Sequence, residues 1–542
     1  MRRSLVLLLA IPLTLTVAVP DWMYSNPSVI DAWVYNGFFR HLPTYATTMF
    51  PSTYYGTRLG WILPGYVAYH VFEPRTAAFV LHLTVYLLAT GSMYGIVRDI
   101  AGSSRALFVA AAFGWYMPVV RALGSDYVDG PVIAYGLLAT LLALRADGAW
   151  TWWRTVCSGI ATGAMLHSNV GAAFLLPSIF VWFVPAPRDL HWTPLATRVL
   201  LWAGGIVLCT AGLALFSVSV GGPWNFFAMS FRWMRSQGST NPFQPPPAPL
   251  LSSAPWLLLP AATAVAALVV MASKERRQRL TEGQVRALIA FASLALLFAI
   301  WDFVGPGAVL YWPFYSSWLL PWSFIVIGGV ITPSPAVTRA HRAVMVVSAG
   351  AVLASLVWPE HVMVPVPAGV GLAIVSAALA IAAAARRPVV AWPLVAVTLV
   401  CLHGWLSATA WYARVDDRAD AFRAIDAGVR IIERYVTRDE PRFLLTSEGR
   451  LGHYIQGLTS VYLWGYTIAS PDFLEITPQQ VARIRPEHVV IVVDERRDTA
   501  AKFDEVFAPY RLRARVLGAE QVQTQHGPLY LTFVEPQPLA SE

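Results

Sequence analysis

Three aspartates have the strongest potential for chemistry in this sequence, because each lies in a polar break beside long apolar segments. Asp31 occurs in the aromatic stretch SVIDAWVYNGFFR, and Asp126 and Asp129 occur in the turn GSDYVDGP. Apolar surroundings raise the basicity of a carboxylate, so Asp31 could serve as a general base. The D-x-x-D pair could orient a substrate, pair with arginine or share a cation. The alternatives are structural: a helix cap or an ion pair with Arg40 for Asp31, and turn punctuation for the pair.

Several arginines with aromatic neighbours could bind a phosphate group at the membrane surface. A guanidinium matches the geometry of phosphate oxygens, and adjacent aromatic rings favour the level of the lipid headgroups. The alternative is that these side chains extend from helix ends toward water or contact acidic lipids. The candidates are Arg58 with the neighbouring Tyr55, Arg121, and the pair Arg232 and Arg235.

His167 is a further candidate, since His167, Ser168 and Asn169 interrupt an apolar stretch. Polar groups at such a break often line a cavity, and a histidine there could contact a bound phosphate. The alternative is a structural histidine whose ring nitrogens are satisfied within a pair of helices.

The elements that position these residues follow from composition. Of the 542 residues, 56% are hydrophobic and only 13% are charged, against about 25% charged in ordinary soluble domains. Residues 1–411 contain 12 acidic and 23 basic residues, whereas residues 412–542 contain 19 acidic and 16 basic residues. These figures exclude a soluble enzyme, a disordered protein and a nucleic-acid binder. They predict a multi-pass α-helical membrane domain over 1–411 and a soluble domain over 412–542.

Thirteen apolar stretches are candidates for membrane-spanning helices. If the N-terminus is cytoplasmic and the spans alternate, 17 of the 23 basic residues fall in cytoplasmic loops, in agreement with the positive-inside rule. This register places the loops 21–74 and 220–253 and the C-terminal domain on the periplasmic face of a bacterial inner membrane. The predicted spans are 4–20, 75–97, 106–121, 130–145, 155–167, 169–184, 197–219, 254–272, 285–301, 312–331, 343–358, 368–385 and 390–411.

The C-terminal segment 412–542 alternates helical and strand patterns, which is typical of a small α/β domain. Helices are expected near 416–436, 478–484 and 499–508, and strands near Phe443–Thr446, His488–Asp494, 511–517 and 528–534.

The candidate carboxylates and arginines therefore collect at the periplasmic face, next to a long first loop. Nucleotide sugars are normally absent outside the cytoplasm, so a sugar used there has to arrive on a lipid phosphate. In such a reaction a carboxylate removes the proton of the acceptor and arginines neutralise the phosphate leaving group.

On these residues the sequence resembles the superfamily-C (GT-C) membrane glycosyltransferases. It is most similar to the bacterial branch that includes protein O-mannosyltransferases and the lipid A aminoarabinose transferase. Asp31 matches the aspartate of the family's first outer loop, and RLGWILPGYVAYHVF at 58–72 is similar to the juxtamembrane segment that ends this loop. The turn SDYVDGP resembles the family's acidic turn, with either Asp126 or Asp129 as the equivalent.

A glycine-rich run also carries the resemblance, since GIATGAMLHSNVGAAFLLPSI at 159–179 is similar to the family's run that ends in leucine-leucine-proline. Two departures accompany it. Ala32 stands where many relatives have a second acid, and Ser168-Asn169 stands where many have Thr-Lys. Without that lysine, Arg58, Arg121 or His167 would have to bind the phosphate.

The resemblance implies an inverting glycosyltransferase that uses a polyprenyl-phosphate-linked sugar and acts on a lipid, glycan or protein acceptor. Asp31 would be the general base, Asp126 and Asp129 would position acceptor or base, and Arg58 with Arg121 would bind the phosphate. The expected partners are this donor and membrane lipids, without nucleic acid. The sequence defines no cofactor, and the acidic turn leaves a divalent cation open. The alternatives are a transporter or lipid-linked glycan flippase, and a non-catalytic relative that acts as a scaffold.

Overall fold

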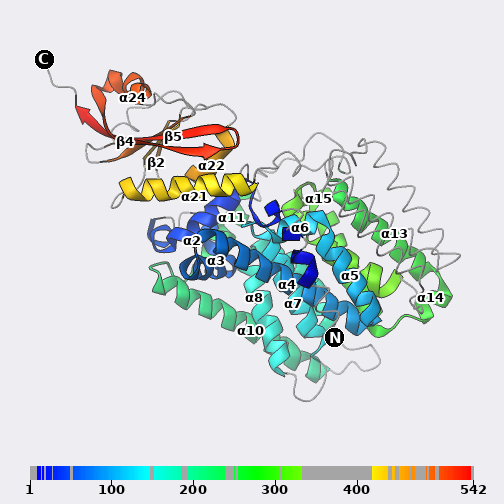
Figure 1. The fold of residues 1–542 in the computed structure, drawn as a ribbon. Helices are drawn as coiled ribbons and strands as arrows, with labels where there is room; N and C mark the ends of the chain where they lie inside the picture. Colours follow the sequence, from blue (N-terminus) through cyan, green and yellow to red (C-terminus); the bar gives the residue numbers. More distant parts are fainter. Residues whose placement is uncertain are drawn as a thin grey trace. The chain divides into compact units, whose positions relative to one another are not determined.

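The fold is known from a computed structural model, which divides into two compact units. The first comprises residues 1–23, 51–64 and 78–414, and the second comprises residues 24–50, 65–77 and 415–542. The structure describes Ile484, Leu250 and the ranges 9–13, 15–16, 20–26, 29–48, 53–146, 152–184, 192–237, 254–305, 307–331, 418–436, 442–445, 451–462, 466–469, 488–494 and 500–538 (Figure 1).

The first unit is helical throughout its described part. Two long helices, α3 (Leu59–Val71) and α4 (Pro74–Ala101), have residues in both units. The other elements of this unit are η1 (Pro20–Met23), η2 (Tyr55–Thr57), α5 (Ser103–Trp115), α6 (Met117–Leu123), α7 (Asp129–Leu144), α8 (Trp152–Leu166), η3 (Val170–Leu175), α9 (Leu176–Phe180), η4 (Val181–Phe183), α10 (Trp192–Ser219), α11 (Ala228–Gln237), η6 (Pro255–Leu257), α13 (Leu258–Ala272), α14 (Lys274–Gln278), α15 (Glu282–Phe303), η7 (Val309–Tyr311), α16 (Pro313–Ser316), α17 (Leu319–Val326) and the π-helical turn η8 (Ile327–Ile331).

Three helices in the described part are long and apolar enough to cross a membrane, namely α4, α15 and residues 194–219 of α10. Shorter apolar helices coincide with five further predicted spans, and α8 coincides with the span predicted at 155–167. The predicted spans at 343–358, 368–385 and 390–411, and most of the span at 4–20, lie outside the described residues. The total of thirteen spans therefore stays a prediction.

Small residues allow α8 and α10 to pack closely. A Cβ atom added at Gly159 would meet the carbonyl oxygen of Trp202, and one added at Gly205 would meet that of Val156. Small residues at helix crossings are typical of membrane proteins, where close van der Waals contact replaces the hydrophobic effect between helices. Several apolar residues of α10 are exposed, with Leu215 75% accessible, as expected for a helix that faces lipid.

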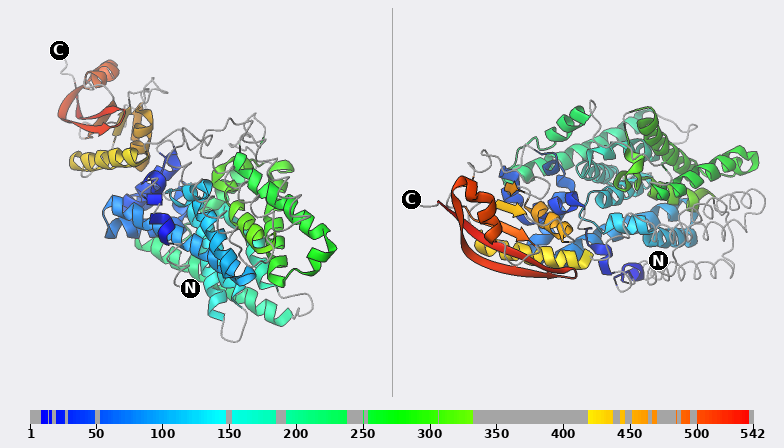
Figure 2. Two further views of the ribbon diagram at one scale, coloured as in Figure 1. Left: turned by 45° about the vertical axis from the view of Figure 1, so that its right-hand side comes forward. Right: turned by 90° about the horizontal axis from the view of Figure 1, so that it is seen from above.

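The second unit contains a five-stranded sheet in the order β2-β1-β3-β5-β4. β1 is parallel to β2 and β3, whereas β5 is antiparallel to β3 and β4. Its elements are α2 (Ile30–Thr48), α21 (Arg418–Tyr435), β1 (Arg442–Leu445), α22 (Gly452–Val461), β2 (Tyr466–Ala469), β3 (Val490–Asp494), α24 (Ala500–Phe507), η10 (Ala508–Tyr510), β4 (Leu512–Thr524) and β5 (Gly527–Pro538). Figure 2 shows β4 and β5 as one long curved hairpin. The expected α/β domain is confirmed, and the helix expected at 478–484 lies outside the described residues except for Ile484.

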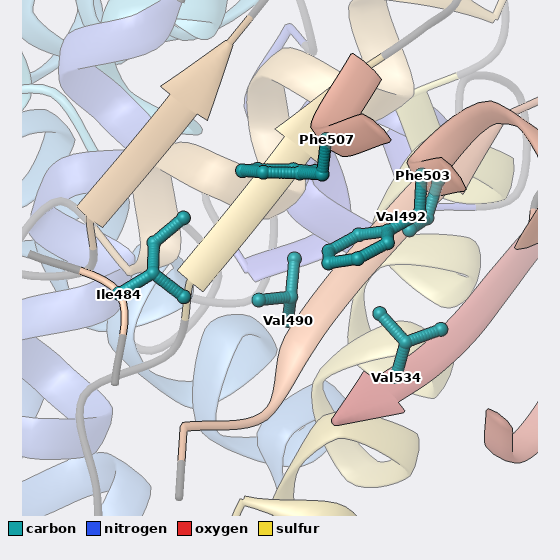
Figure 3. Close-up of a cluster of buried hydrophobic side chains, with 6 residues drawn as sticks. All are labelled: Ile484, Val490, Val492, Phe503, Phe507 and Val534. Carbon is teal, nitrogen blue, oxygen red and sulfur yellow. The ribbon is translucent and has the colours of Figure 1, made fainter. Parts of the chain in front are cut away.

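Helices cover both faces of this sheet. Successive residues of a strand point to opposite sides, so each strand contributes to two buried interfaces. Val490, Val492 and Val534 pack with Phe503 and Phe507 of α24 in a buried cluster that Ile484 completes (Figure 3). On the other face, the ring of Phe533 stacks on that of Tyr435 of α21, with the ring centroids 4.0 Å apart.

Part of the first predicted outer loop folds together with the C-terminal residues, since α2 packs against α22 in the second unit. The Tyr45 hydroxyl donates to the carbonyl oxygen of Val461 at 2.6 Å. The rings of Trp33 and Tyr24 contact that of Phe422. The aromatic residues of this loop therefore form a hydrophobic interface with α21 and α22.

A buried ion pair joins the same two chain segments. Arg40 Nη1 lies 2.9 Å from Asp426 Oδ1, and the two side chains are 9% and 10% exposed. Arg40 Nε also donates to Asn36 Oδ1 at 2.8 Å, and the guanidinium lies over the ring of Tyr69. Arg40 is thus paired with an acid that is distant in sequence, and Asp31 is not the partner of this contact.

Burial, and secondarily the Arg40 charge, lower the pKa of His41 to about 4. His41 is therefore neutral at pH 7, and its Nε2 contact with Glu433, at 3.9 Å, is not an ion pair there. Burial also raises the pKa of Glu433. Arg40 is consequently the charged residue of α2 that binds α21.

We expect Arg40→Gln to lower the stability of the second unit by about 3 kcal/mol, because it leaves the buried Asp426 with Arg430 as its one basic partner among the described residues. The measurement is thermal unfolding of the purified protein in detergent. The control is Arg423→Gln, which removes an exposed pair with Asp420 and should cost at most about 1 kcal/mol. Equal effects of the two variants would contradict the structural role of Arg40.

Candidate functional site

The segment Thr57–Trp61, called here the TRLGW segment, connects most of the predicted site residues of the first unit. It links the short helix η2 to α3. The Thr57 hydroxyl lies 2.6 Å from the Ser230 hydroxyl of α11, and Trp61 Nε1 donates to the backbone oxygen of Asp126 at 2.5 Å. Between these contacts, Gly60 N donates to the backbone oxygen of His167 at 3.0 Å.

Gly60 is required for this arrangement because the backbone of α8 lies against it. A Cβ atom at this position would meet the carbonyl oxygen of Ala164, and it would lie 2.9 Å from both His167 C and Ser168 N. The carbonyl oxygen of Gly60 accepts a hydrogen bond from the Tyr135 hydroxyl of α7 at 3.3 Å. The segment is thereby fixed between α7 and the end of α8.

Arg58 is the buried cation of this site, with 6% of its surface exposed. Its guanidinium carbon lies 4.9 Å from the ring centroid of Tyr54 and 5.8 Å from that of Tyr127. The predicted residue Tyr55 stacks on Tyr54 with the ring centroids 4.3 Å apart. Aromatic faces stabilise a cation that has lost part of its water, so Arg58 is held in a position from which it can attract an anion.

The acidic turn supplies a buried carboxylate, and a histidine that the sequence did not reveal contacts it. Asp126 Oδ1 lies 3.2 Å from His82 Nε2, and each side chain is 1% exposed. His82 Nδ1 lies 2.7 Å from the backbone oxygen of Met23. The only signal for His82 in the sequence is a histidine within an apolar span.

Asp129 is the first residue of α7 and is 4% exposed. Its Oδ1 accepts a hydrogen bond from the backbone of Gly130 at 3.1 Å. Among the described residues it has no basic partner. Burying a carboxylate without a cation is costly. Asp129 is therefore a better candidate than Asp126 for a direct contact with a bound molecule.

His167 follows α8 and has a structural contact. Its Nε2 lies 2.8 Å from the Thr210 hydroxyl of α10, and its ring contacts that of Phe226. The next polar residue, Asn169, begins η3, and its Oδ1 accepts from Gly171 N at 3.0 Å. The break that the sequence shows at 167–169 is therefore a turn that the TRLGW segment contacts.

The remaining arginines lie at separate places in the first unit. Arg121 is half-buried in the last turn of α6, on the N-terminal side of the acidic turn. Arg232 is exposed on α11, three residues from Met229, whose sulfur its Nη1 approaches at 3.8 Å. Arg235 belongs to the same helix. The contact between Thr57 and Ser230 joins this helix to the TRLGW segment.

Asp31 belongs to the second unit, where it lies in the first turn of α2 and is half-buried. The partial positive charge of a helix N-terminus stabilises an ionised carboxylate. The neighbouring Ala32, Trp33 and Val34 are buried. The role of Asp31 as a base stays a prediction.

The first unit therefore combines a cation between aromatic rings with two buried carboxyl groups that differ in their partners. This arrangement can bind an anionic group and position a polar group beside it. The described residues contain no group of three or more His, Cys, Asp or Glu side chains that could hold a metal ion.

The fold is similar to that of ArnT from Cupriavidus metallidurans. The crystal structure of ArnT bound to undecaprenyl phosphate gives a TM-score of 0.54 at 13% identity, over 97% of this chain and 97% of that chain. The apo structure gives 0.53 at 14% identity, over 96% of this chain and 97% of that chain. The archaeal oligosaccharyltransferase AglB from Archaeoglobus fulgidus gives 0.42 at 13% identity, over 97% of this chain and 74% of that chain. No protein-family model and no curated protein sequence matches the chain.

The similarity to ArnT extends over nearly the whole chain, so it includes the helical part and the C-terminal α/β part. At the level of the fold, it agrees with the resemblance expected from the sequence. It also supports a multi-pass membrane protein with a C-terminal α/β domain.

We expect Gly60→Ala to destabilise the first unit by about 3 kcal/mol, because the added methyl group meets backbone atoms that cannot turn aside. The control is Gly91→Ala in α4, where a Cβ atom has nothing within 4 Å and should stabilise the helix by up to about 1 kcal/mol. Thermal unfolding in detergent measures both. A Gly60→Ala protein as stable as the Gly91→Ala protein would show that the close approach is not required.

Proposed function

We propose that the chain is an integral-membrane glycosyltransferase of the GT-C type. It transfers a sugar from a polyprenyl-phosphate-linked donor to a lipid, glycan or protein acceptor at the periplasmic face of a bacterial inner membrane. The observation that carries the proposal is the buried guanidinium of Arg58, which is held between two tyrosine rings beside an acidic turn at the ends of apolar helices. The similarity to ArnT, crystallised with undecaprenyl phosphate, supports the same donor class.

Arg58 binds the phosphate of the donor in this proposal. Its two aromatic neighbours remove it from water, so its attraction to an anion is stronger than that of an exposed arginine. As the sugar–phosphate bond breaks, negative charge grows on the leaving phosphate and the guanidinium stabilises it. Arg121 adds positive charge from α6. Tyr55, Arg232 and Arg235 contribute to binding of the lipid phosphate at the membrane surface.

Asp31 is the general base. The acceptor oxygen attacks the anomeric carbon, its proton passes to Asp31, and the bond from this carbon to the phosphate oxygen breaks. A single displacement of this kind inverts the anomeric configuration and releases the polyprenyl phosphate. Asp126 and Asp129 position the acceptor or the base. Because Asp126 already contacts His82, Asp129 is the one of the two that we assign to a substrate hydroxyl.

The proposed topology has thirteen spans, a cytoplasmic N-terminus and the C-terminal domain in the periplasm. The distribution of basic residues supports it, since 17 of the 23 in residues 1–411 then lie in cytoplasmic loops. The loops 21–74 and 220–253 are periplasmic in this arrangement, and they border the route by which an acceptor reaches the site.

We expect Asp31→Asn to lower the rate of transfer by about 10²- to 10⁴-fold, because the amide cannot accept the proton. The measurement is incorporation of labelled sugar into acceptor by membranes that contain equal amounts of each protein. The control is Glu73→Gln, which neutralises an exposed acid of the same predicted loop and should leave transfer unchanged. Undiminished transfer by Asp31→Asn would rule out this base.

We expect Arg58→Met to weaken binding of undecaprenyl phosphate by more than about tenfold, since the phosphate loses a charge-assisted contact. The control is Arg75→Met, which removes an exposed arginine and should leave binding unchanged. Both affinities are measured by calorimetric titration. The purified variants must show the same elution profile as the wild type. Equal binding by wild type and Arg58→Met would contradict the assignment. Binding without transfer in the wild type would instead favour a flippase.

A further inference from the structure

His82 is a buried histidine of α4 whose two ring nitrogens lie near oxygen atoms of two different chain segments. Its Nδ1 lies 2.7 Å from the backbone oxygen of Met23, the last residue of η1. Its Nε2 lies 3.2 Å from Oδ1 of Asp126, in the turn between α6 and α7. The side chain therefore connects α4 with the start of the first predicted outer loop and with the acidic turn.

The contact with Met23 determines where the second nitrogen points. A carbonyl oxygen only accepts hydrogen bonds, so Nδ1 of His82 carries a hydrogen and donates it to Met23. An imidazole ring is rigid, and a hydrogen bond at one nitrogen therefore restricts the direction of the other. In His82 the second nitrogen is directed at the buried carboxyl group of Asp126.

The acidic turn is contacted from two further directions. The ring of Trp61 lies along that of His82, with the ring centroids 6.4 Å apart and an angle of 29° between the planes. Trp61 Nε1 also donates to the backbone oxygen of Asp126 at 2.5 Å. The backbone of η1 lies against the same turn, since a Cβ atom added at Gly124 would meet the carbonyl oxygen of Trp22. His82 thus contacts each of the three segments that meet here, namely η1, the acidic turn and the TRLGW segment.

This junction is directly connected to the cation of the candidate site. Tyr127 follows Asp126 in the chain, and its ring centroid lies 5.8 Å from the guanidinium carbon of Arg58. Because the peptide unit between Asp126 and Tyr127 is planar, a shift of the Asp126 backbone also moves Tyr127. Trp61 lies three residues after Arg58. Both residues that His82 contacts on this side are therefore close in the chain to residues that hold or surround the guanidinium.

We propose that His82 is a positioning residue of the donor site. Its two ring nitrogens fix the acidic turn against η1, and this fixes Tyr127 beside the Arg58 guanidinium that binds the donor phosphate. His82 itself does not contact the donor. The proposal rests on the function proposed above and adds a residue to the phosphate-binding part of that site.

Two substitutions separate the contacts of His82. In His82→Asn the amide nitrogen lies near the place of Nδ1, so the contact with Met23 is kept and that with Asp126 is lost. In His82→Gln the amide nitrogen lies near the place of Nε2, so an N–H group still faces Asp126. Both variants lose the ring and one contact, so a role in packing alone predicts the same effect for both. The test is calorimetric titration of the full-length proteins in nanodiscs with undecaprenyl phosphate.

We expect His82→Asn to weaken binding of undecaprenyl phosphate about five- to tenfold, because the turn loses the side-chain contact that fixes it. His82→Gln should bind within about twofold of the wild type. Equal losses in the two variants would leave His82 a role in packing only and would overturn the proposal, as would wild-type affinity in His82→Asn. A wild type that does not bind undecaprenyl phosphate overturns the proposed function, and the positioning role with it.

Asp126→Asn tests the same contact from the other side. It should weaken binding as much as His82→Asn does, and the double variant should be no weaker than either single variant, because both changes remove one interaction. Losses that add up in the double variant would show that the two residues act separately and would contradict the proposal. So would unchanged binding by Asp126→Asn, which is informative even if His82→Asn does not fold.

Tyr86→Phe is a matched control in the same helix, one turn after His82. Tyr86 is fully buried, and its hydroxyl donates to the backbone oxygen of Gly114 at 2.8 Å. The substitution removes one buried hydrogen bond of α4 and keeps the ring. We expect it to lower the melting temperature and to leave the affinity for undecaprenyl phosphate unchanged. A loss of affinity equal to that of His82→Asn would show that any weakening of α4 disturbs the site, and it would overturn the specific role of His82.

Discussion

The close approach of Gly60 to the backbone at the end of α8 is the constraint on which the candidate site of the first unit depends. A hydrogen bond of 3.0 Å between Gly60 and His167 is compatible with the packing only if residue 60 has no side chain. Once this contact is made, the residues on either side of it have little freedom. Arg58 is directed between the tyrosine rings and Trp61 reaches the backbone of Asp126. One glycine thereby sets the positions of a cation, an acidic turn and a polar turn.

The predicted first outer loop is divided between the two units, and its composition explains the division. Its aromatic helix α2 has large apolar side chains, among them Trp33, Phe38 and Tyr45, that need a partner surface. The amphipathic helices α21 and α22 of the C-terminal segment provide one. The buried pair of Arg40 and Asp426 adds specificity, since a buried charge restricts packing to arrangements in which it is paired.

Local patterns in the sequence predicted much of the architecture. Continuous apolar stretches located the helices α7, α10 and α15 to within a few residues, and the run HVVIVVD located β3. The hairpin of β4 and β5 extends further than expected, because each strand continues by pairing with the other beyond the part that the sheet buries. The helix α22 and the strand β2 were not predicted, and each is short, with ten and four residues.

The site was predictable only where residue type alone carried the signal. Asp126, Asp129 and Arg58 were identified because charged residues are scarce beside apolar segments. The contacts of His82 and Gly60 depend on chain segments that are far apart in sequence, so local spacing could not indicate them. For the same reason the arrangement of Arg40 with Asp426, across 386 positions in the numbering, was not foreseen.

The two acids in the turn have different partners, which suggests that they have different roles in the site. Asp126 contacts a histidine and a tryptophan binds its backbone, so its position is determined by the protein itself. Asp129 is bound by backbone N–H groups, among them that of Gly130, and has no basic partner among the described residues. A carboxyl group of this kind costs stability unless a bound molecule offers it a hydrogen bond. Asp129 is therefore where we expect a substrate to complete the hydrogen bonding of the turn.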